Sequence, residues 1–400
     1  MPLLNSRPDC LTADTPQNDW EAGGFGLYIH WPFCAAKCPY CDFNSHVTAK
    51  IDHLRWRNAY LAELARCAEL TRGRVLRTVF FGGGTPSLMD PDTVAAIMDR
   101  IKALWPTAND FEVTLEANPT SVEAAKFRAF QDAGVSRVSM GIQSLHDEDL
   151  KRLGRIHSSA EAIAAFDVAR KIFERVSFDL IYARQGQTLE GWKAELTQAL
   201  DLSIDHLSLY QLTIEPGTAF GDRHARGRLR DLPDDDNAAD MFDLTQQLCA
   251  AHGMPAYEVS NHAADGAQSR HNLIYWRYGD YLGIGPGAHG RVTTPQGRMA
   301  TETFRQPEKW LDAVEKRGSG ESLIDPLDLP AQASEYLMMS LRLDEGTDTA
   351  RLKRLGLALD PAKLSHLIEL GLLDVRGDQL RTTLEGRRVL NAILRDLLSE

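Results

Sequence analysis

The feature that most limits the folds open to this chain is a repeated alternation of strand-like and helical segments. Runs of β-branched and aromatic residues predict six strands, at Gly26–His30, Thr78–Phe81, Phe111–Glu116, Arg137–Gly141, Val176–Tyr182 and His206–Leu212. Longer amphipathic patterns predict helices between them, at His53–Leu70, Pro91–Leu104, Ser121–Ala133, Ser158–Phe173 and Leu189–Leu200. Such alternation forms parallel sheets with right-handed crossovers, so we expect an α/β fold built on a partial (β/α)6 TIM-like barrel.

Composition limits the class of protein. With 400 residues, of which 43% are hydrophobic and 25% charged, the chain can form one large domain and a smaller one. Its formal net charge of −12 argues against nucleic acid as the main partner, because phosphate binding needs a basic surface. Residues 1–24 are polar and lack an apolar core segment, so we expect a disordered tail rather than a targeting peptide. We expect no membrane span and a reducing, cytoplasmic setting.

Three closely spaced cysteines, Cys34, Cys38 and Cys41, follow the first predicted strand with the spacing C-x3-C-x2-C. Three thiolates on one loop can hold three corners of a four-iron cubane and leave the fourth iron open, whereas electron-transfer clusters normally take four cysteines. An open iron can chelate the amine and carboxylate of S-adenosylmethionine (SAM). The spacing therefore predicts a [4Fe-4S] cluster with SAM bound to it.

A structural zinc site is the competing interpretation of the same cysteines. His30 or His46 could supply a fourth ligand, but zinc-binding cysteines usually come as two separated pairs. A disulfide fits poorly, because the clustered cysteines are odd in number and nothing marks the chain as secreted. Cys67 and Cys249 lie in helical patterns and are expected to be small core residues.

Polar residues lie where the predicted strands end, and in parallel barrels the chemistry sits at those ends. They are Gly82–Pro86, Glu116, Gln143, Asp179 and Tyr210. The glycine run is not a phosphate-binding P-loop, because no Gly-Lys-Ser/Thr follows it. Glycines let backbone groups approach a ligand such as an amino-acid ammonium; a plain tight turn would also use them, but the cysteine triplet disfavours that interpretation.

These motifs together resemble the anaerobic coproporphyrinogen III oxidase family of radical SAM proteins. The resemblance covers nearly the whole chain past residue 25 and rests on the following segments: Leu27–Cys34 with the cysteine triplet, Gly82–Pro86, Leu115–Pro119, Gly141–Ser144 and Asp179–Tyr182. The family has an oxidase branch, which decarboxylates porphyrinogen propionates, and a branch of HemW-type heme chaperones. The oxidase carries a fourth cysteine where this chain has Phe43, and a longer N-terminal segment. Both departures favour the chaperone branch.

The resemblance implies roles for individual residues. Cys34, Cys38 and Cys41 would ligate the cluster, with Lys37 close to their charge. The residues implied to bind SAM are Tyr28, Gly83, Gly84, Thr85, Glu116, Gln143, Arg155 and Asp179. From the residues alone, Arg155 is more readily an exposed arginine at a helix end. The segment Ala183–Thr188 departs from the family, and we expect its Arg184 to be solvated rather than to reach an anionic substrate.

The run His271-Asn272-Leu273-Ile274-Tyr275-Trp276 matches an H-N-x-x-Y-W pattern typical of the heme-chaperone branch. If the run is helical, His271 and Tyr275 share a face, and Trp276 adds a flat apolar surface for a porphyrin. Imidazole is a common axial ligand of heme iron, so His271, Tyr275 and Trp276 are the heme candidates. Packing at the barrel's open edge explains them equally well. His289 is a second candidate; its glycine-rich surroundings are no dinucleotide site, because they neither follow a clear strand nor open a helix.

A smaller domain is predicted from Pro326, where two prolines mark a linker. We divide the chain into a tail (1–24), a radical SAM barrel with its C-terminal extension (25–325) and a mainly helical, winged-helix-like domain (326–400). Predicted helices at Gln332–Arg342, Thr347–Leu355 and Pro361–Leu370 precede a hairpin at Val375–Gln379 and a helix at Leu384–Leu398. The acidic charge favours packing or partner docking over DNA binding.

The sequence therefore predicts a heme chaperone that carries a SAM-ligated [4Fe-4S] cluster and passes heme to an unidentified acceptor, which is free to be membrane-bound. The alternative is an oxygen-independent coproporphyrinogen III oxidase; a structural zinc protein is a third hypothesis. Cleavage of SAM stays open at this point. If it occurs, the cluster gives one electron to the sulfonium and a 5′-deoxyadenosyl radical forms.

Overall fold

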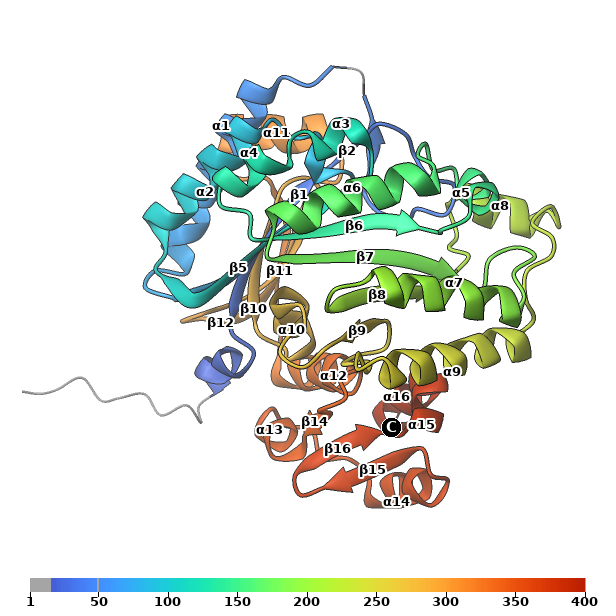
Figure 1. The fold of residues 1–400 in the computed structure, drawn as a ribbon. Helices are drawn as coiled ribbons and strands as arrows, with labels where there is room; N and C mark the ends of the chain where they lie inside the picture. The colour runs from blue at the N-terminus through green and yellow to red at the C-terminus, as the bar shows by residue number, and fades with distance from the viewer. Residues whose placement is uncertain (1–15, 49, 400) are drawn as a thin grey trace, which may run out of the picture.

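The computed structural model describes residues 16–48 and 50–399 and contains the predicted parallel sheet. The six predicted strands are all present and pair in parallel in chain order. They are β1 (Phe25–Trp31), β4 (Leu76–Gly83), β5 (Thr107–Ala117), β6 (Arg137–Gln143), β7 (Arg175–Tyr182) and β8 (His206–Gln211). The predicted α/β fold with a partial barrel is therefore confirmed (Figure 1).

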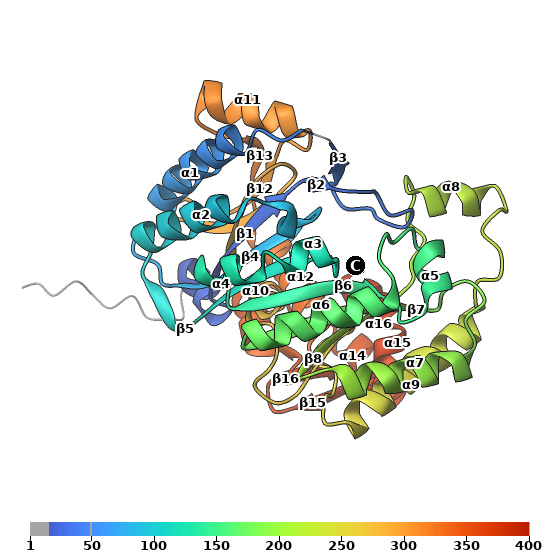
Figure 2. The same ribbon diagram turned by 45° about the horizontal axis from the view of Figure 1, so that its top comes forward.

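Helices cover the outer face of this curved sheet (Figures 1 and 2). They are α1 (His53–Leu70), α2 (Pro91–Leu104), α3 (Ser121–Ala124), α4 (Phe127–Asp132), α6 (Ser159–Ile172) and α7 (Leu189–Leu202). The single helix expected over 121–133 is two short helices. The chain tightens between them, where the Lys126 amide donates to the Glu123 carbonyl, and the Glu123 carboxylate is bound by Ser87 and by the amide of Asn118.

The sheet extends beyond the predicted strands at both edges. It has eleven strands and the order β13-β12-β11-β10-β1-β4-β5-β6-β7-β8-β9. The added strands are β9 (Asn261–Ala263), β10 (Asp280–Ile284), β11 (His289–Thr294), β12 (Gly297–Thr303) and β13 (Glu321–Pro326). β10 runs parallel to β1, and α11 (Pro307–Arg317) packs on α1 through stacked Trp56 and Trp310 rings 5.5 Å apart.

The C-terminal segment has its own hydrophobic cluster and a three-stranded antiparallel sheet. Its elements are α12 (Leu329–Ser340), β14 (Thr347–Asp348), α13 (Thr349–Arg354), α14 (Pro361–Glu369), β15 (Leu373–Arg376), β16 (Gln379–Thr382), α15 (Leu384–Arg388) and α16 (Leu390–Leu398). The helix expected over 384–398 is broken at Val389, which lies outside helical geometry at φ −116° and ψ 22°. The segment lies beside α9 (Asp235–Ala251), where Arg388 pairs with Asp243 (Figure 1).

We expected a disordered tail over residues 1–24, and this expectation is wrong for its second part. Residues 1–15 lie outside the described part of the chain, but Pro16–Ala22 form a 3-10 helix. Asp19 pairs with the Arg351 guanidinium at 2.7 Å, and the Arg74 guanidinium lies 4.2 Å from the centre of the Trp20 ring. These contacts tie the segment to both the barrel and the C-terminal segment.

In the ranges that the structure describes, no helix combines the length and apolarity that crossing a membrane requires.

Candidate functional site

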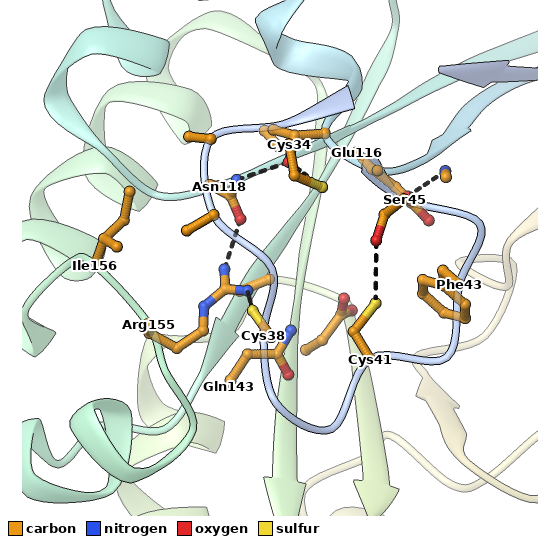
Figure 3. A pocket seen from close by; sticks show the side chains of 18 of the residues that line it. Cys34, Cys38, Cys41, Phe43, Ser45, Glu116, Asn118, Gln143, Arg155 and Ile156 are labelled. Carbon is orange, nitrogen blue, oxygen red and sulfur yellow. Dashed lines mark hydrogen bonds between the residues drawn. The ribbon is translucent and has the colours of Figure 1, made fainter. Parts of the chain in front are cut away.

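A pocket at the carboxyl ends of the parallel strands gathers the three cysteines with seven of the eight residues predicted to bind SAM (Figure 3). Its volume is about 150 Å³. The predicted residues that line it are Cys34, Cys38, Cys41, Gly83, Gly84, Thr85, Glu116, Gln143, Arg155 and Asp179. The cysteine loop reaches the end of the sheet that carries α5 (Asp147–Arg152) and α8 (Ala219–Ala225), where the Phe220 amide donates to the Pro39 carbonyl (Figure 2).

Each cysteine thiol has a polar neighbour, and those of Cys34 and Cys38 come from outside the loop. Thr85 Oγ1 lies 3.4 Å from Cys34 Sγ, and Arg155 Nη1 lies 3.4 Å from Cys38 Sγ. Within the loop, Ser45 Oγ lies 3.9 Å from Cys41 Sγ (Figure 3). Burial raises the pKa of the Cys34 and Cys41 thiols, so the charge of bound iron is what would hold them as thiolates.

The donor set fits an iron-sulfur cluster. All three thiols are unpaired and partly exposed to one pocket. Across residues 16–48 and 50–399, no three histidine, cysteine or carboxylate side chains gather around one point, as ligands of a single ion do. A cubane instead takes one thiolate at each of three irons, so its ligands need not converge on one point.

The glycine run brings the end of β4 against the cysteine loop. A Cβ at Gly84 would lie 2.7 Å from the Phe33 carbonyl oxygen and 3.0 Å from Cys34 Sγ. A Cβ at Gly83 would lie 2.6 Å from the His30 ring, and its φ of 111° disfavours other residues as well. A side chain at Gly84 would push the cysteine loop away and one at Gly83 would displace the His30 ring of β1, so the run is more than a plain tight turn.

Gln143 reaches the pocket from a strained backbone position. Its φ of 74° is unusual for a residue other than glycine. The pairing of β6 with β7 shifts register between Met140 and Gln143, which marks a bulge. Bulges and left-handed residues commonly aim a side chain at a functional site, and the Gln143 side chain lies among the cysteines and Arg155 (Figure 3).

Arg155 is held inside the site rather than exposed at a helix end. Its Nη2 donates to Asn118 Oδ1 at 2.6 Å and to the Gly141 carbonyl at 2.7 Å. Asn118 Nδ2 donates in turn to Thr85 Oγ1 at 3.1 Å. Asn118 was not predicted as a site residue. The sequence signal that could have identified Asn118 is its position. It lies two residues after Glu116, directly after β5, and therefore at the same edge of the sheet as the other site residues.

Two carboxyl groups form the inner wall of the pocket. Burial and the nearby Asp179 charge raise the pKa of Glu116 to about 8, although the Gly83 amide donates to Glu116 Oε2 at 3.2 Å. Burial raises the pKa of Asp179 to about 6, against hydrogen bonds from Ser208 and Ser139 and the charges of Arg137 and Arg155. A protonated Glu116 both donates and accepts hydrogen bonds, which suits a ligand that presents hydroxyl groups.

Tyr28 is the predicted SAM residue that the structure does not place in this pocket. Its hydroxyl lies 3.0 Å from His30 Nδ1. The Tyr28 side chain lines a second cavity of about 210 Å³ inside the barrel, which also borders Glu116 and Asp179. Tyr210, His271 and Tyr275 line this inner cavity too.

The predicted heme candidates are helical, as expected, but do not form one surface. They lie in α10 (Arg270–Trp276), where His271 Nε2 is 2.7 Å from Tyr275 Oη and His271 Nδ1 is 2.7 Å from Thr78 Oγ1. His271 is 1% exposed, and burial lowers its pKa to about 3. Trp276 instead packs in a separate cluster with Tyr257. Heme ligation by His271 would therefore require the hydrogen bond on one of its ring nitrogens to break and the buried side chain to become accessible.

Two further expectations concern residues outside the pocket. Arg184 is 3% exposed and contacts Glu195 Oε2 at 2.5 Å and Asp149 Oδ2 at 3.0 Å, so the expectation of a solvated arginine is wrong. Two carboxylates, from α7 and α5, offset the cost of its burial. Cys67 and Cys249 are buried in the main hydrophobic cluster, as predicted.

Comparison with known proteins gives three kinds of match. Residues 28–197 match the Radical SAM superfamily and residues 327–389 the HemN C-terminal domain. The chain is 41% identical to the heme chaperone HemW of Escherichia coli (strain K12), covering 94% of this chain and 98% of that protein. It is 33% identical to HemW of Bacillus subtilis (strain 168), covering 93% and 99% respectively.

A mitochondrial relative and a solved structure extend this comparison. The chain is 40% identical to the mitochondrial radical S-adenosyl methionine domain-containing protein 1 of Mus musculus, covering 94% of this chain and 87% of that protein. The structure of coproporphyrinogen III oxidase (HemN) from Escherichia coli superposes with a TM-score of 0.79 over 96% of this chain and 93% of that chain. Its identity of 22% supports the shared fold alone.

Proposed function

Because the chain belongs to the HemW family of radical SAM proteins, we propose that it is a heme chaperone, which binds heme and passes it to an acceptor protein. The observation that carries the proposal is the near-full-length identity of 33–41% to HemW proteins named as heme chaperones. The pocket supports it, because the cysteine triplet and the polar strand ends gather at one place.

Within this proposal, Cys34, Cys38 and Cys41 hold a [4Fe-4S] cluster and the adjoining pocket binds SAM. Held by these thiolates, a reduced cluster would be able to supply one electron to the sulfonium of SAM. Arg155 is the cation in the pocket that can pair with the carboxylate of the methionine part. Protonated Glu116 can exchange hydrogen bonds with the ribose hydroxyls, and Thr85 and Gln143 add polar contacts.

Coproporphyrinogen III oxidation is the second candidate, because the HemN structure shares the fold over nearly the whole chain. Phe43 argues against it, since it stands where the oxidase has a fourth cysteine. Its side chain is 61% exposed at the pocket edge.

The test is a hemin titration of anaerobically reconstituted protein, followed by absorbance, beside a coproporphyrinogen III turnover assay on the same sample. We expect stoichiometric heme binding and no turnover. Transfer is tested by mixing the heme-loaded protein with an apo heme protein and following the shift of the Soret band. Turnover without heme binding would establish the oxidase instead.

A further inference from the structure

A partly exposed histidine, His46, lies on the cysteine loop, and its neighbours fix which ring nitrogen is free. Asn44 Nδ2 donates to the carbonyls of Pro286 and Arg305, both at 2.9 Å. These two bonds assign the orientation of the amide, so Asn44 Oδ1 is the atom that faces His46 Nε2 at 3.2 Å. An amide oxygen only accepts, so Nε2 carries the proton and Nδ1 keeps its lone pair in the neutral ring.

This arrangement is the one that metal-binding histidines use. Such a histidine commonly donates its second ring N–H to a fixed carbonyl or carboxylate, which sets the tautomer and the ring orientation. Burial and the nearby Lys37 charge lower the pKa of His46, against a hydrogen bond to the Arg305 carbonyl, so its imidazole is neutral at neutral pH. The hydrogen bond with Asn44 leaves Nδ1 as the ligating atom.

The surroundings of His46 match the chemistry of heme, which is a flat apolar ring with two carboxylates at one edge. Phe43 and Val47, in the same segment of the chain, are 61% and 58% exposed, and Ile156 across the pocket mouth is 64% exposed (Figure 3). The cations that act on His46 are those of Lys37 and Arg305, and both side chains are exposed. Within the described ranges neither forms an ion pair with a carboxylate; the Lys37 ammonium donates only to the Ser45 carbonyl, at 3.4 Å, and keeps donors for a propionate.

We propose that the segment Asp42–Val47, together with Lys37 and Arg305, is the heme-binding surface of this protein, with His46 Nδ1 as an axial ligand of the iron. The inference rests on the proposed heme-chaperone function and adds the place and the ligand. A surface site leaves one edge of the heme open to an acceptor, as transfer requires. It also places the heme beside the cysteine pocket.

The other candidate histidines fit this role less well. Both ring nitrogens of His271 are hydrogen-bonded and its side chain is buried. His289 is exposed on β11, but its Nδ1 lies 3.6 Å from the Glu302 carboxylate, which would repel a propionate. His46 combines a free nitrogen, exposed apolar neighbours and two cations.

The test compares His46→Ala with His289→Ala, a matched removal of an exposed histidine outside the proposed site. Both variants and the wild type are reconstituted anaerobically, checked for equal iron and sulfide content, and titrated with hemin. We expect His46→Ala to bind hemin at least tenfold more weakly, with a shifted Soret band that added imidazole restores. His289→Ala should match the wild type. An unchanged Soret band and an affinity within twofold for His46→Ala would overturn the inference.

A second variant covers the case in which His46→Ala fails to fold or to hold its cluster. Arg305→Glu changes an exposed side chain outside the cysteine loop, and we expect it to weaken hemin binding about tenfold. Hemin dimethyl ester, which lacks the two charges, should then bind the wild type and the charge variant alike. Equal hemin affinity in both proteins would count against the surface.

The outcomes separate this inference from the function on which it rests. A wild type that binds no hemin overturns the chaperone proposal and the site together. A wild type that binds hemin while His46→Ala and the charge variant bind it equally well overturns only the site.

Discussion

The two ends of the barrel differ in how their polar groups are used. At the closed end, between the amino-terminal halves of β1 and β4, His271 is bonded on both ring nitrogens at 2.7 Å and shielded from solvent. At the open end, the Cys34 and Cys38 sulfurs lie 3.4 Å from Thr85 Oγ1 and Arg155 Nη1 and border a cavity. Buried polar groups that satisfy each other stabilise a fold, whereas groups with spare capacity can bind a ligand. The most distinctive sequence motif outside the cysteine loop thus lies at the end that is built for stability.

The sharpest test of the open end removes one thiol. Cys38→Ala should lose nearly all of the cluster after reconstitution. The site offers only three thiolates, and a cubane bound in this way needs all three. Iron and sulfide analysis with absorbance near 400 nm measures the loss.

Cys249→Ala is the matched control, since Cys249 is buried in the core and should keep full iron content. Iron retained at the wild-type level in Cys38→Ala would remove the assignment of this pocket as the cluster site.

The next largest effect is expected on SAM affinity when Arg155, the cation at the open end of the barrel, is replaced. Arg155→Met should weaken SAM binding about 100-fold, or about 2.7 kcal/mol, because it removes the charge-assisted bond to the carboxylate and leaves Asn118 Oδ1 unpaired. Isothermal titration of the anaerobic, cluster-loaded protein measures the affinity. Arg152→Met, three residues away and largely exposed, should change it less than twofold. An equal change in both variants would show that Arg155 does not pair with SAM.

The sequence predicts those features of the fold that are encoded by residues close together in the chain. The α1 and α2 helices match their predicted bounds, because Asp52 and Asp90 cap their starts and each carries one apolar face. The cysteine triplet and the polar strand ends were predictable because parallel strands bring their carboxyl ends together. Apart from Gly82 and Tyr210, these residues line one pocket, which agrees with that rule.

The features that were missed depend on contacts between distant segments. β10 pairs with β1 across more than two hundred residues, and its short run carries little strand pattern of its own. The burial of Arg184 depends on carboxylates supplied by α5 and α7, which its own sequence neighbourhood does not show. Likewise, His271 is hydrogen-bonded by Thr78, which is distant in the sequence. His46 is oriented by the Asn44 amide, which is held in turn by the distant Pro286 carbonyl.

A variant at the closed end tests whether His271 is structural. His271→Ala should lower the free energy of unfolding by about 2–4 kcal/mol, because it leaves a cavity and strands the hydroxyls of Thr78 and Tyr275. Urea unfolding followed by circular dichroism measures the change. His289→Ala, on an exposed strand position, should change stability by less than about 0.5 kcal/mol. Hemin affinity that fell in a stable His271→Ala protein would instead support the sequence-based hypothesis of a heme ligand there.

The smallest expected effect is a dependence of the folding stability on pH, which arises at Glu116, between the two cavities. Glu116 borders both cavities, and burial together with the Asp179 charge raises its pKa in the folded state to about 8. A raised pKa means that the folded state binds the proton more tightly. The stability that this contributes is complete below about pH 4.5 and is lost as pH rises through about 8, by at most about 1.4 kcal/mol per pH unit.

Glu116→Gln removes this titration while keeping the shape of the protonated acid. Urea unfolding at pH 5, 6, 7 and 8 should show the wild type losing about 1–2 kcal/mol relative to the variant, less than the limit because water in the pocket screens the charges. The exposed Glu190→Gln should follow the wild type at every pH. If the Glu116→Gln and wild-type curves run parallel, Glu116 is ionised across this range and serves the pocket as an acceptor only. Like the paired groups of the closed end, an ionised Glu116 would have no hydrogen-bond donor to offer a ligand.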